Sequence, residues 1–286
     1  MPRIRVVTDS ACDIPENLVR QHEITVVPLR LAWGAETYPD KGGITTDETL
    51  ARVRAGLVPE VDSPQIEDFS RTYRSLRESS DGAISLHMSA RLSDTYASAS
   101  VAREAFGPVG AGGPFPVAVV DTQSVSMGLG WVVLAVARAA AGGMDLPRLV
   151  GLAGRLSGQS HFAFFTENTE ILLKSGRVGR LAGQADSLAQ LRPLFHLDEG
   201  GVAVYERTRT RAKARDALYN FVEDFPKIGE LCVVHTNVTQ NDVEHLLTRI
   251  GAIYPRERVM IVRPGPALAS WLGPDAMGVA VLEGEE

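Results

Sequence analysis

The chain has 286 residues, of which 44% are hydrophobic and 22% are charged. These proportions are typical of a folded globular protein and exclude a disordered chain. The formal net charge of −6 and a sequence pI of about 5.6 argue against a nucleic-acid-binding protein.

The cysteines and the apolar runs indicate the cellular compartment of such a protein. Cys12 and Cys232 stand far apart, and neither has metal-ligand spacing around it. They favour a reducing compartment over a secreted disulfide framework. The N-terminus enters a strand pattern directly, which predicts no signal peptide, and the apolar run 128–141 is too short to span a bilayer. The sequence thus predicts a cytoplasmic protein, and we expect no metal or other cofactor.

The first half of the chain alternates between buried strands and helical patterns. Asp13 is predicted to cap a short helix that begins at residue 14, and residues 34–43 are predicted to form a surface loop. The four predicted strands are 4–7, 24–31, 82–86 and 117–120. Strands that alternate with helices are typical of a parallel, doubly wound sheet.

The second half is also α/β, but its pattern is less regular. A hairpin over residues 194–207 implies at least one antiparallel pair of strands. We therefore predict a mixed sheet, and we place the domain boundary at 157–159, with domains 1–157 and 158–286. The other predicted elements are strands at 161–165, 231–235, 258–262 and 278–282, and helices at 211–225 and 240–250.

A hydroxyl-rich loop, residues 89–95, joins the third strand to a helix predicted over 96–106. Unpaired backbone N–H groups and the helix dipole favour an anion at such a helix start, for example a carboxylate or a phosphate. Ser93 and Thr95 could add hydroxyl donors there. The alternative is that Ser93 only caps the helix. Similar polar loops follow two other strands, and the carboxyl ends of parallel strands meet at one edge of a sheet. The sequence therefore predicts a ligand site at this edge.

A serine-dependent acyl hydrolase or transferase is the main alternative to a binding protein. No Gly-x-Ser-x-Gly spacing surrounds the candidate serines, and no phosphate-binding Gly-x-x-x-x-Gly-Lys is present. The candidate nucleophiles are Ser10, Ser93 and Ser126, and the candidate bases are His87, His161, His196 and His235.

Four of the polar residues at strand ends have a simpler interpretation than catalysis. His87 and His235 are each predicted to hydrogen-bond to nearby backbone. Asp9 and Asp121 could hold Mg²⁺, but they are predicted to cap loops and helices instead. We therefore predict that the protein is not an enzyme.

The loops and several further motifs together resemble the DegV family of bacterial fatty-acid-binding proteins, over about residues 4–283. Each motif alone is weak, but the ordered set is specific. The matching segments are Val7-Thr8-Asp9-Ser10, Val27-Pro28-Leu29, Tyr38-Pro39-Asp40, residues 89–99, residues 121–130, Ser175-Gly176-Arg177-Val178-Gly179 and Arg207-Thr208-Arg209-Thr210-Arg211.

The resemblance implies two α/β domains that hold one long-chain fatty acid in a tunnel between them. It also implies that the carboxylate is presented to a partner fatty-acid kinase, as a step of phospholipid metabolism, and that transient membrane contact accompanies this role. The residues implied at the head group are Ser93, Thr95, Val61, Ser63 and Trp271; those that support the pocket are Thr8, Asp9, Ser10 and Ser126; and those that contact the kinase are Arg177 and Arg209.

The head-group positions depart from the family pattern. Val61 stands where the family often has threonine, and Trp271 stands where it has histidine. Asp94 and Asp275 each replace a glycine. An apolar site of this kind suits a neutral head group or a carboxylate that stays in contact with water, because a buried carboxylate needs donors. A different apolar ligand is therefore a further alternative.

Overall fold

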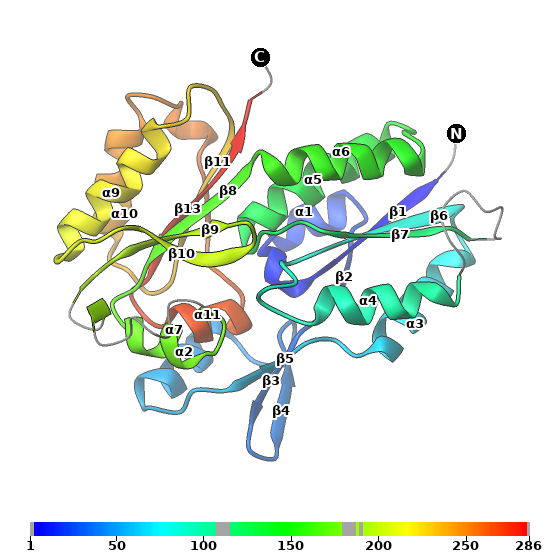
Figure 1. Ribbon diagram of the computed structural model, residues 1–286, viewed down its shortest axis with the longest axis horizontal. Coiled ribbons are helices and arrows are strands. Elements are labelled where there is room, and N and C mark those ends of the chain that lie inside the picture. Colours follow the sequence, from blue (N-terminus) through cyan, green and yellow to red (C-terminus); the bar gives the residue numbers. More distant parts are fainter. Residues whose placement is uncertain (1–2, 107–114, 179–186, 189–190, 285–286) are drawn as a thin grey trace.

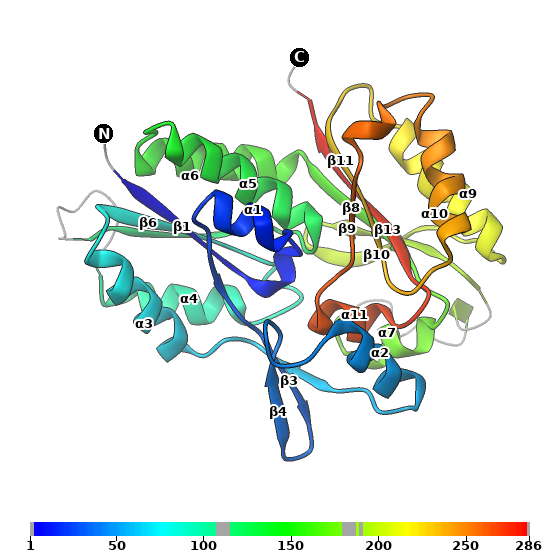
Figure 2. The same ribbon diagram turned by 180° about the vertical axis from the view of Figure 1, so that it is seen from behind.

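The protein is described by a computed structural model that covers residues 3–106, 115–178, 187–188 and 191–284. Two β-sheets lie side by side, and helices cover their outer faces (Figure 1). A third, small sheet projects from the side of the molecule where the other two meet (Figure 2). The predicted fold class, a parallel sheet followed by an α/β unit with a mixed sheet, is confirmed.

The first sheet has four parallel strands in the order β2-β1-β6-β7. Apolar residues alternate between its two faces, so that Val7 and Ala83 contact one layer of helices while Val6 and Ile84 contact the other. The strands are β1 (Ile4–Asp9), β2 (Thr25–Val27), β6 (Gly82–His87) and β7 (Val117–Asp121). The helices are α3 (Ile66–Arg77) and α4 (Thr95–Glu104) on one face, and α1 (Glu16–Gln21), α5 (Met127–Ala141) and α6 (Leu146–Gly158) on the other.

The second sheet has six strands in the order β10-β9-β8-β13-β11-β12, and among these the β11–β12 pair is parallel. Helices α9 (Arg211–Glu223) and α10 (Gln240–Ile250) cover its outer face through a separate apolar cluster. The strands are β8 (Ser160–Phe165), β9 (Leu194–Asp198), β10 (Gly201–Glu206), β11 (Ile228–His235), β12 (Met260–Val262) and β13 (Met277–Glu283).

Helix α5 joins the two halves of the molecule. Eleven of its fifteen residues are buried, which is the pattern of a helix enclosed on all sides. It packs against β1 of the parallel sheet and against β8 and β13 of the mixed sheet, and Trp131 Nε1 donates to the carbonyl of Ala280 at 3.2 Å. One apolar core therefore runs from one sheet to the other. We call the contact between residues up to α6 and residues from β8 onward the seam.

Shorter elements border the seam. The small antiparallel sheet has the order β4-β3-β5, and helix α2 lies beside it. Helix α11 packs against both α2 and α7. The bounds are β3 (Arg30–Trp33), β4 (Glu36–Pro39), β5 (Glu60–Asp62), α2 (Thr46–Arg54), α7 (Thr169–Lys174) and α11 (Pro266–Leu272).

Several predicted elements were wrong. The strand predicted over 24–31 divides at Pro28, which has no N–H to donate to a neighbouring strand. Residues 36–39 of the predicted surface loop form β4. Asp13 does not cap α1, because Pro15 occupies that position and the Asp13 carboxylate points elsewhere. Helix α11 was not predicted. The domain boundary at 157–159 stays a prediction; α6 ends at Gly158 and β8 begins at Ser160.

Candidate ligand-binding site

Three hydroxyl groups meet at the start of α4. The Oγ atom of Ser93 lies 2.7 Å from Ser63 Oγ and 2.8 Å from Thr95 Oγ1, and it accepts the N–H of Thr95 at 3.3 Å. Ser93 and Thr95 are buried, and Ser63 is half-buried. Each hydroxyl carries one proton, and two of the three are used inside the cluster, so one remains to donate to a ligand oxygen. We call these three residues the hydroxyl cluster.

Ser93 does more than cap the helix. The N-cap of α4 is Asp94, whose side chain makes no capping hydrogen bond. Ser63 reaches the cluster from the loop after β5, while Ser93 lies in the loop after β6 and Thr95 is the first residue of α4. Two loops thus converge on one point at the carboxyl end of the parallel sheet.

Arg177 and Trp271 come to the same place from across the seam. The Arg177 guanidinium lies over the Trp271 ring, with its central carbon 4.2 Å from the ring centroid. One terminal nitrogen donates to the carbonyl of Val61 at 2.7 Å, and the other donates to the carbonyl of Leu92. Burial lowers the pKa of Arg177, against the attraction of Asp94 and Asp62. Arg177 therefore bridges the two loops that carry the hydroxyl cluster.

The two acidic residues that replace glycines lie outside the hydroxyl cluster. The side chain of Asp94 is exposed. Asp275 is about half exposed and lies 4.0 Å from Arg54, measured between Oδ2 and Nη2. Neither carboxylate is hydrogen-bonded to Ser63, Ser93 or Thr95 in the described part of the chain. Direct repulsion of a ligand carboxylate by these groups is therefore small, because water screens exposed charges.

Two buried carboxylates hold the N-terminal end of α11. Asp13 Oδ1 accepts the N–H of Gly265 at 2.7 Å, and Asp40 Oδ1 accepts the N–H of Ala267 at 2.6 Å. Burial raises the pKa of both groups, that of Asp13 to about 7, although the Gly265 and Ser126 hydrogen bonds oppose the rise at Asp13. Since α11 carries Trp271, these contacts position the tryptophan from across the seam.

The C-terminal end of α11 is fixed by threonines. Thr166 Oγ1 donates to the carbonyl of Leu272 at 2.5 Å, and Thr236 Oγ1 donates to the carbonyl of Gly273 at 3.0 Å. Thr236 Oγ1 also accepts the N–H of Ala276 at 2.8 Å. These bonds satisfy carbonyls that a helix leaves unpaired at its end.

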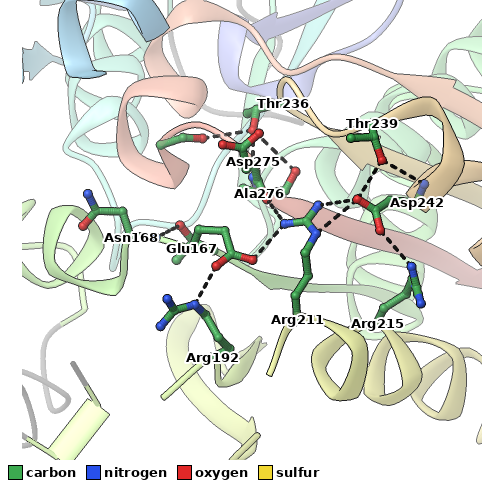
Figure 3. Close-up of polar contacts among 12 residues, drawn as sticks. Glu167, Asn168, Arg192, Arg211, Arg215, Thr236, Thr239, Asp242, Asp275 and Ala276 are labelled. Atoms are coloured by element: carbon green, nitrogen blue, oxygen red, sulfur yellow. Dashed lines mark hydrogen bonds and ion pairs between the residues drawn. The ribbon is translucent and has the colours of Figure 1, made fainter. Parts of the chain in front are cut away.

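A charged network surrounds the segment that follows α11 (Figure 3). Arg211 donates to Glu167 at 2.9 Å, to Asp242 at 3.2 Å and to the carbonyl of Asp275 at 2.8 Å. Glu167 also accepts from Arg192 at 2.6 Å, and Asp242 also accepts from Arg215 at 2.8 Å. Charges of both signs alternate, so each charged group has an opposite charge beside it. The network anchors the loop from α11 to β13 onto α9 and α10.

A second polar chain is fully buried in the first half. The ring of His87 bonds through Nδ1 to Asp9 Oδ2 at 3.0 Å and through Nε2 to Ser85 Oγ at 2.7 Å, and Tyr73 OH donates to Ser85 Oγ at 2.9 Å. All four side chains are buried. The prediction that His87 bonds to local backbone was wrong, because two side chains satisfy both ring nitrogens.

The Asp9–His87–Ser85 order resembles a catalytic triad, but Ser85 lies in the middle of a buried strand. At the sheet edge, Ser93 bonds to hydroxyls, and the described histidines bond elsewhere. The Nδ1–H group of His235 donates to the carbonyl of its neighbour Thr236, as predicted, His161 pairs with Glu283, and His196 packs edge-on against Tyr205. Among the described residues, none of the candidate nucleophiles Ser10, Ser93 and Ser126 therefore has a histidine as its hydrogen-bond partner.

The residues predicted to support the pocket lie at the ends of β1 and α5. Ser10 Oγ accepts the N–H of Leu29 at 3.0 Å, and Ser126 Oγ donates to Asp13 at 2.7 Å. Thr8 Oγ1 is buried without a hydrogen-bond partner among the described residues. Asp9 Oδ1 accepts the N–H of Ala11 at 3.1 Å. The capping prediction is confirmed for Asp9 and also for Asp121, which accepts the N–H groups of Gln123 and Ala90.

The remaining predictions concern partners and metals. Arg209 is exposed just before α9. Gly179 of the Ser175–Gly179 motif lies outside the described residues. No described cluster of histidine, cysteine, aspartate and glutamate is arranged to hold a metal ion. Among the helices in the described ranges, none has the length and hydrophobicity to cross a membrane.

Sequence reasoning missed Asp13, Arg211 and Glu167 as residues that position the site. The structure marks Asp13 through its left-handed backbone conformation, with a φ of 51°, which a non-glycine residue seldom adopts without a specific role. Its partner Gly265 is 252 positions away in sequence. No local pattern could have paired them.

The chain is similar to known proteins over nearly its full length. A DegV domain-containing protein of Streptomyces coelicolor is 30% identical over 282 residues, which cover 97% of this chain and 98% of that protein. The structure of a DegV family protein from Thermus thermophilus, described as binding fatty acid, has a TM-score of 0.87 and 31% identity, and covers 98% of this chain and 99% of its own.

A DegV lipid-binding protein from Thermotoga maritima has a TM-score of 0.83 and 26% identity, with 99% of this chain and all of that chain covered. The family model described as "Uncharacterised protein, DegV family" matches residues 3–284. With the parallel and mixed sheets and the ordered loops already in place, these matches show that the chain belongs to the DegV family.

Proposed function

We propose that the protein binds one long-chain fatty acid along the seam, with the carboxyl group at the hydroxyl cluster, and that it does so without catalysis. The observation that carries this proposal is the contact of Ser93 with Ser63 and Thr95 beside Arg177 and Trp271. The Thermus and Thermotoga relatives, which are described as binding fatty acid or lipid, support it.

The energetics agree with such a ligand. Burying about a dozen methylene groups is worth roughly 10 kcal/mol before the costs of association. The apolar core that spans both sheets includes Trp271 and Val61, and it offers hydrophobic surface for the acyl chain of the ligand. The head group then needs hydrogen-bond donors, and the cluster offers one free hydroxyl proton. Thr8, Asp9, Ser10 and Ser126 support the site from the neighbouring loops in this proposal.

A more specific role for the bound fatty acid is suggested by the resemblance to the DegV family. We propose that the carboxyl end is presented in the cytoplasm to a fatty-acid kinase, in the service of phospholipid metabolism, and that the ligand is exchanged during brief membrane contact. The exposed side chain of Arg209 is accessible to a partner's carboxylates. The replacement of polar family residues by Val61 and Trp271 also keeps a second candidate open, namely an apolar ligand with a neutral head group.

Mass spectrometry of the organic extract from denatured, freshly purified protein distinguishes these ligands. We expect one acyl species per chain with a free carboxyl group. A stoichiometric neutral lipid would favour the second candidate. The absence of any acyl species, together with no binding of added oleic acid, would contradict the proposal as a whole.

Replacing Ser93 by alanine is expected to weaken oleic acid binding by about tenfold or more, because a hydrogen bond to a charged group is worth about 1.5–3 kcal/mol. Isothermal titration calorimetry measures the change, and Ser75→Ala, at an exposed serine of α3, serves as the control. A hydrolase would instead turn over acyl esters and lose that turnover in Ser93→Ala. Equal affinity in both variants would show that Ser93 does not contact the ligand.

A further inference from the structure

Arg177 is held in a conformation that a surface arginine would not adopt without several contacts. It follows α7, which is capped at its C-terminal end by Ser175, and Gly176 takes a left-handed conformation with a φ of 73°. That turn redirects the chain so that the Arg177 side chain points back to the seam. The Arg177 N–H also donates to Ser175 Oγ at 3.3 Å.

The contacts of this side chain cross the seam twice. Arg177 belongs to the second half of the molecule, while Val61 and Leu92, whose carbonyls accept from it, belong to the first. Leu92 directly precedes Ser93, and Val61 is two residues before Ser63. A single guanidinium therefore ties both segments that carry the hydroxyl cluster to the second half of the molecule. Its planar face rests on Trp271, which is itself fixed at both ends of α11.

A pocket lies on the solvent side of this pair. Its volume is about 740 Å³, and its walls include Val61, Asp62, Asn168, Arg177 and Trp271. Ser63, Ser93 and Thr95 do not line this pocket. Arg177 does line it, and it also donates to the carbonyl of Leu92, the residue before Ser93. The guanidinium and the indole thus stand between the pocket and the hydroxyl cluster. The Nε atom of Arg177 is buried without a partner among the described residues.

We infer that Arg177, stacked on Trp271, is a latch across the seam that closes the polar end of the ligand site against this pocket. The inference rests on the proposed function and gives Arg177 a positioning role in ligand retention. While the latch is closed, the ligand carboxyl group is shielded from water. When the two hydrogen bonds open, the carboxyl end faces the pocket and the ligand can leave or be presented there.

The test uses the full-length protein loaded with oleic acid that is labelled with ¹³C at the carboxyl carbon. Release is followed by transfer of the ligand to phosphatidylcholine vesicles, and solvent access is followed by broadening of the carboxyl ¹³C line with a soluble nitroxide. Arg177→Ala is expected to release oleic acid about tenfold faster, because two charge-assisted hydrogen bonds and a cation–π contact are lost. Its carboxyl line should also broaden more than that of the parent protein.

Two further variants make the result specific. Arg20→Ala removes an exposed arginine of α1 and should match the parent in both measurements. Arg177→Lys keeps the charge, but an ammonium cannot donate to both carbonyls while lying flat on the indole, so it should also release faster; it decides the question if Arg177→Ala does not fold. Parent-like release and broadening in both Arg177 variants would overturn the latch and leave the proposed function intact. Failure of the parent to bind oleic acid would overturn both.

Discussion

Replacing His87 by alanine is expected to lower the free energy of unfolding by about 3–5 kcal/mol, the cost of breaking a buried, hydrogen-bonded charge network. The imidazole joins Asp9 to Ser85 inside the first half of the protein, where none of the three side chains meets solvent. Its loss would leave the Asp9 carboxylate with fewer donors and would leave a void beside Phe69, whose ring centroid lies 5.0 Å from that of His87. Urea denaturation followed by tryptophan fluorescence measures the change.

His235→Ala is the matched control. His235 also lies at the end of a strand, but it is half-buried and bonds to the carbonyl of its neighbour Thr236 at 2.6 Å. Its loss should cost less than about 1 kcal/mol, as is usual for positions without a buried network. A loss of the same small size in His87→Ala would mean that the buried chain contributes little to stability.

The direction of the hydrogen bonds explains why this network stabilises the fold and does not act as a triad. The Nδ1–H group of His87 donates to Asp9, so Nε2 accepts from Ser85, and Ser85 in turn accepts from Tyr73. Burial raises the pKa of the Tyr73 hydroxyl and keeps it a donor. Each group of the chain is therefore satisfied internally, and the Ser85 oxygen has no access to a substrate. A large stability loss in His87→Ala, with no acyl-ester turnover in either the parent or the variant, would agree with this structural role.

Elements whose periodicity and capping residues lie within their own segment could be predicted from the local sequence. Helix α10 begins and ends at the predicted residues, since its apolar periodicity and its capping residue lie within or next to the segment. Prediction failed around the small sheet. Pro28 interrupts an apolar run that otherwise reads as one strand, and the exposed strand β4 has too few buried residues to give a clear alternation. Only pairing with β3 makes it a strand.

The contacts of the candidate site also fall into two groups, those that the local sequence predicts and those that depend on tertiary packing. Ser93 and Thr95 could be placed together from the local sequence alone, because they are two residues apart at the start of a helix. Arg177 could not be placed beside Leu92, from which it is separated by 85 positions, nor Asp13 beside Gly265. Such contacts depend on how the two halves pack. A single sequence contains no periodicity or spacing that records them, and the family resemblance supplied motif positions without their geometry.

The pH dependence of stability should reveal the contact between Asp13 and α11. Burial raises the pKa of Asp13 from 3.8 to about 7, so the folded protein prefers the neutral carboxyl group. Below about pH 4 this group is protonated in both states. Between about pH 4 and pH 7 the unfolded chain ionises while the folded chain does not, so the free energy of unfolding falls as pH rises. Above pH 7 the loss is complete, at about 4 kcal/mol for a difference of about three pKa units.

Asp13→Asn is expected to remove this dependence. Asparagine tolerates the left-handed backbone conformation at this position, and its amide oxygen can still accept the N–H of Gly265. Because the amide does not ionise, the fall in unfolding free energy between pH 5 and pH 8 should be about 3 kcal/mol smaller than in the parent protein. The contribution of Asp40, whose pKa burial also raises, is present in both proteins. Urea denaturation at the two pH values measures the difference.

The exposed Glu104 on α4 supplies the control, since Glu104→Gln removes a carboxylate from the surface and should leave the pH profile as it is in the parent. The decisive comparison is between the two pH values within one variant. If Asp13→Asn lowers the unfolding free energy equally at pH 5 and pH 8, the carboxylate is needed in its charged form to hold Gly265. If the loss is confined to pH 5, or the variant is the more stable protein at pH 8, the neutral form holds α11. The position of Trp271 then depends on a contact across the seam that weakens as the solution becomes more alkaline.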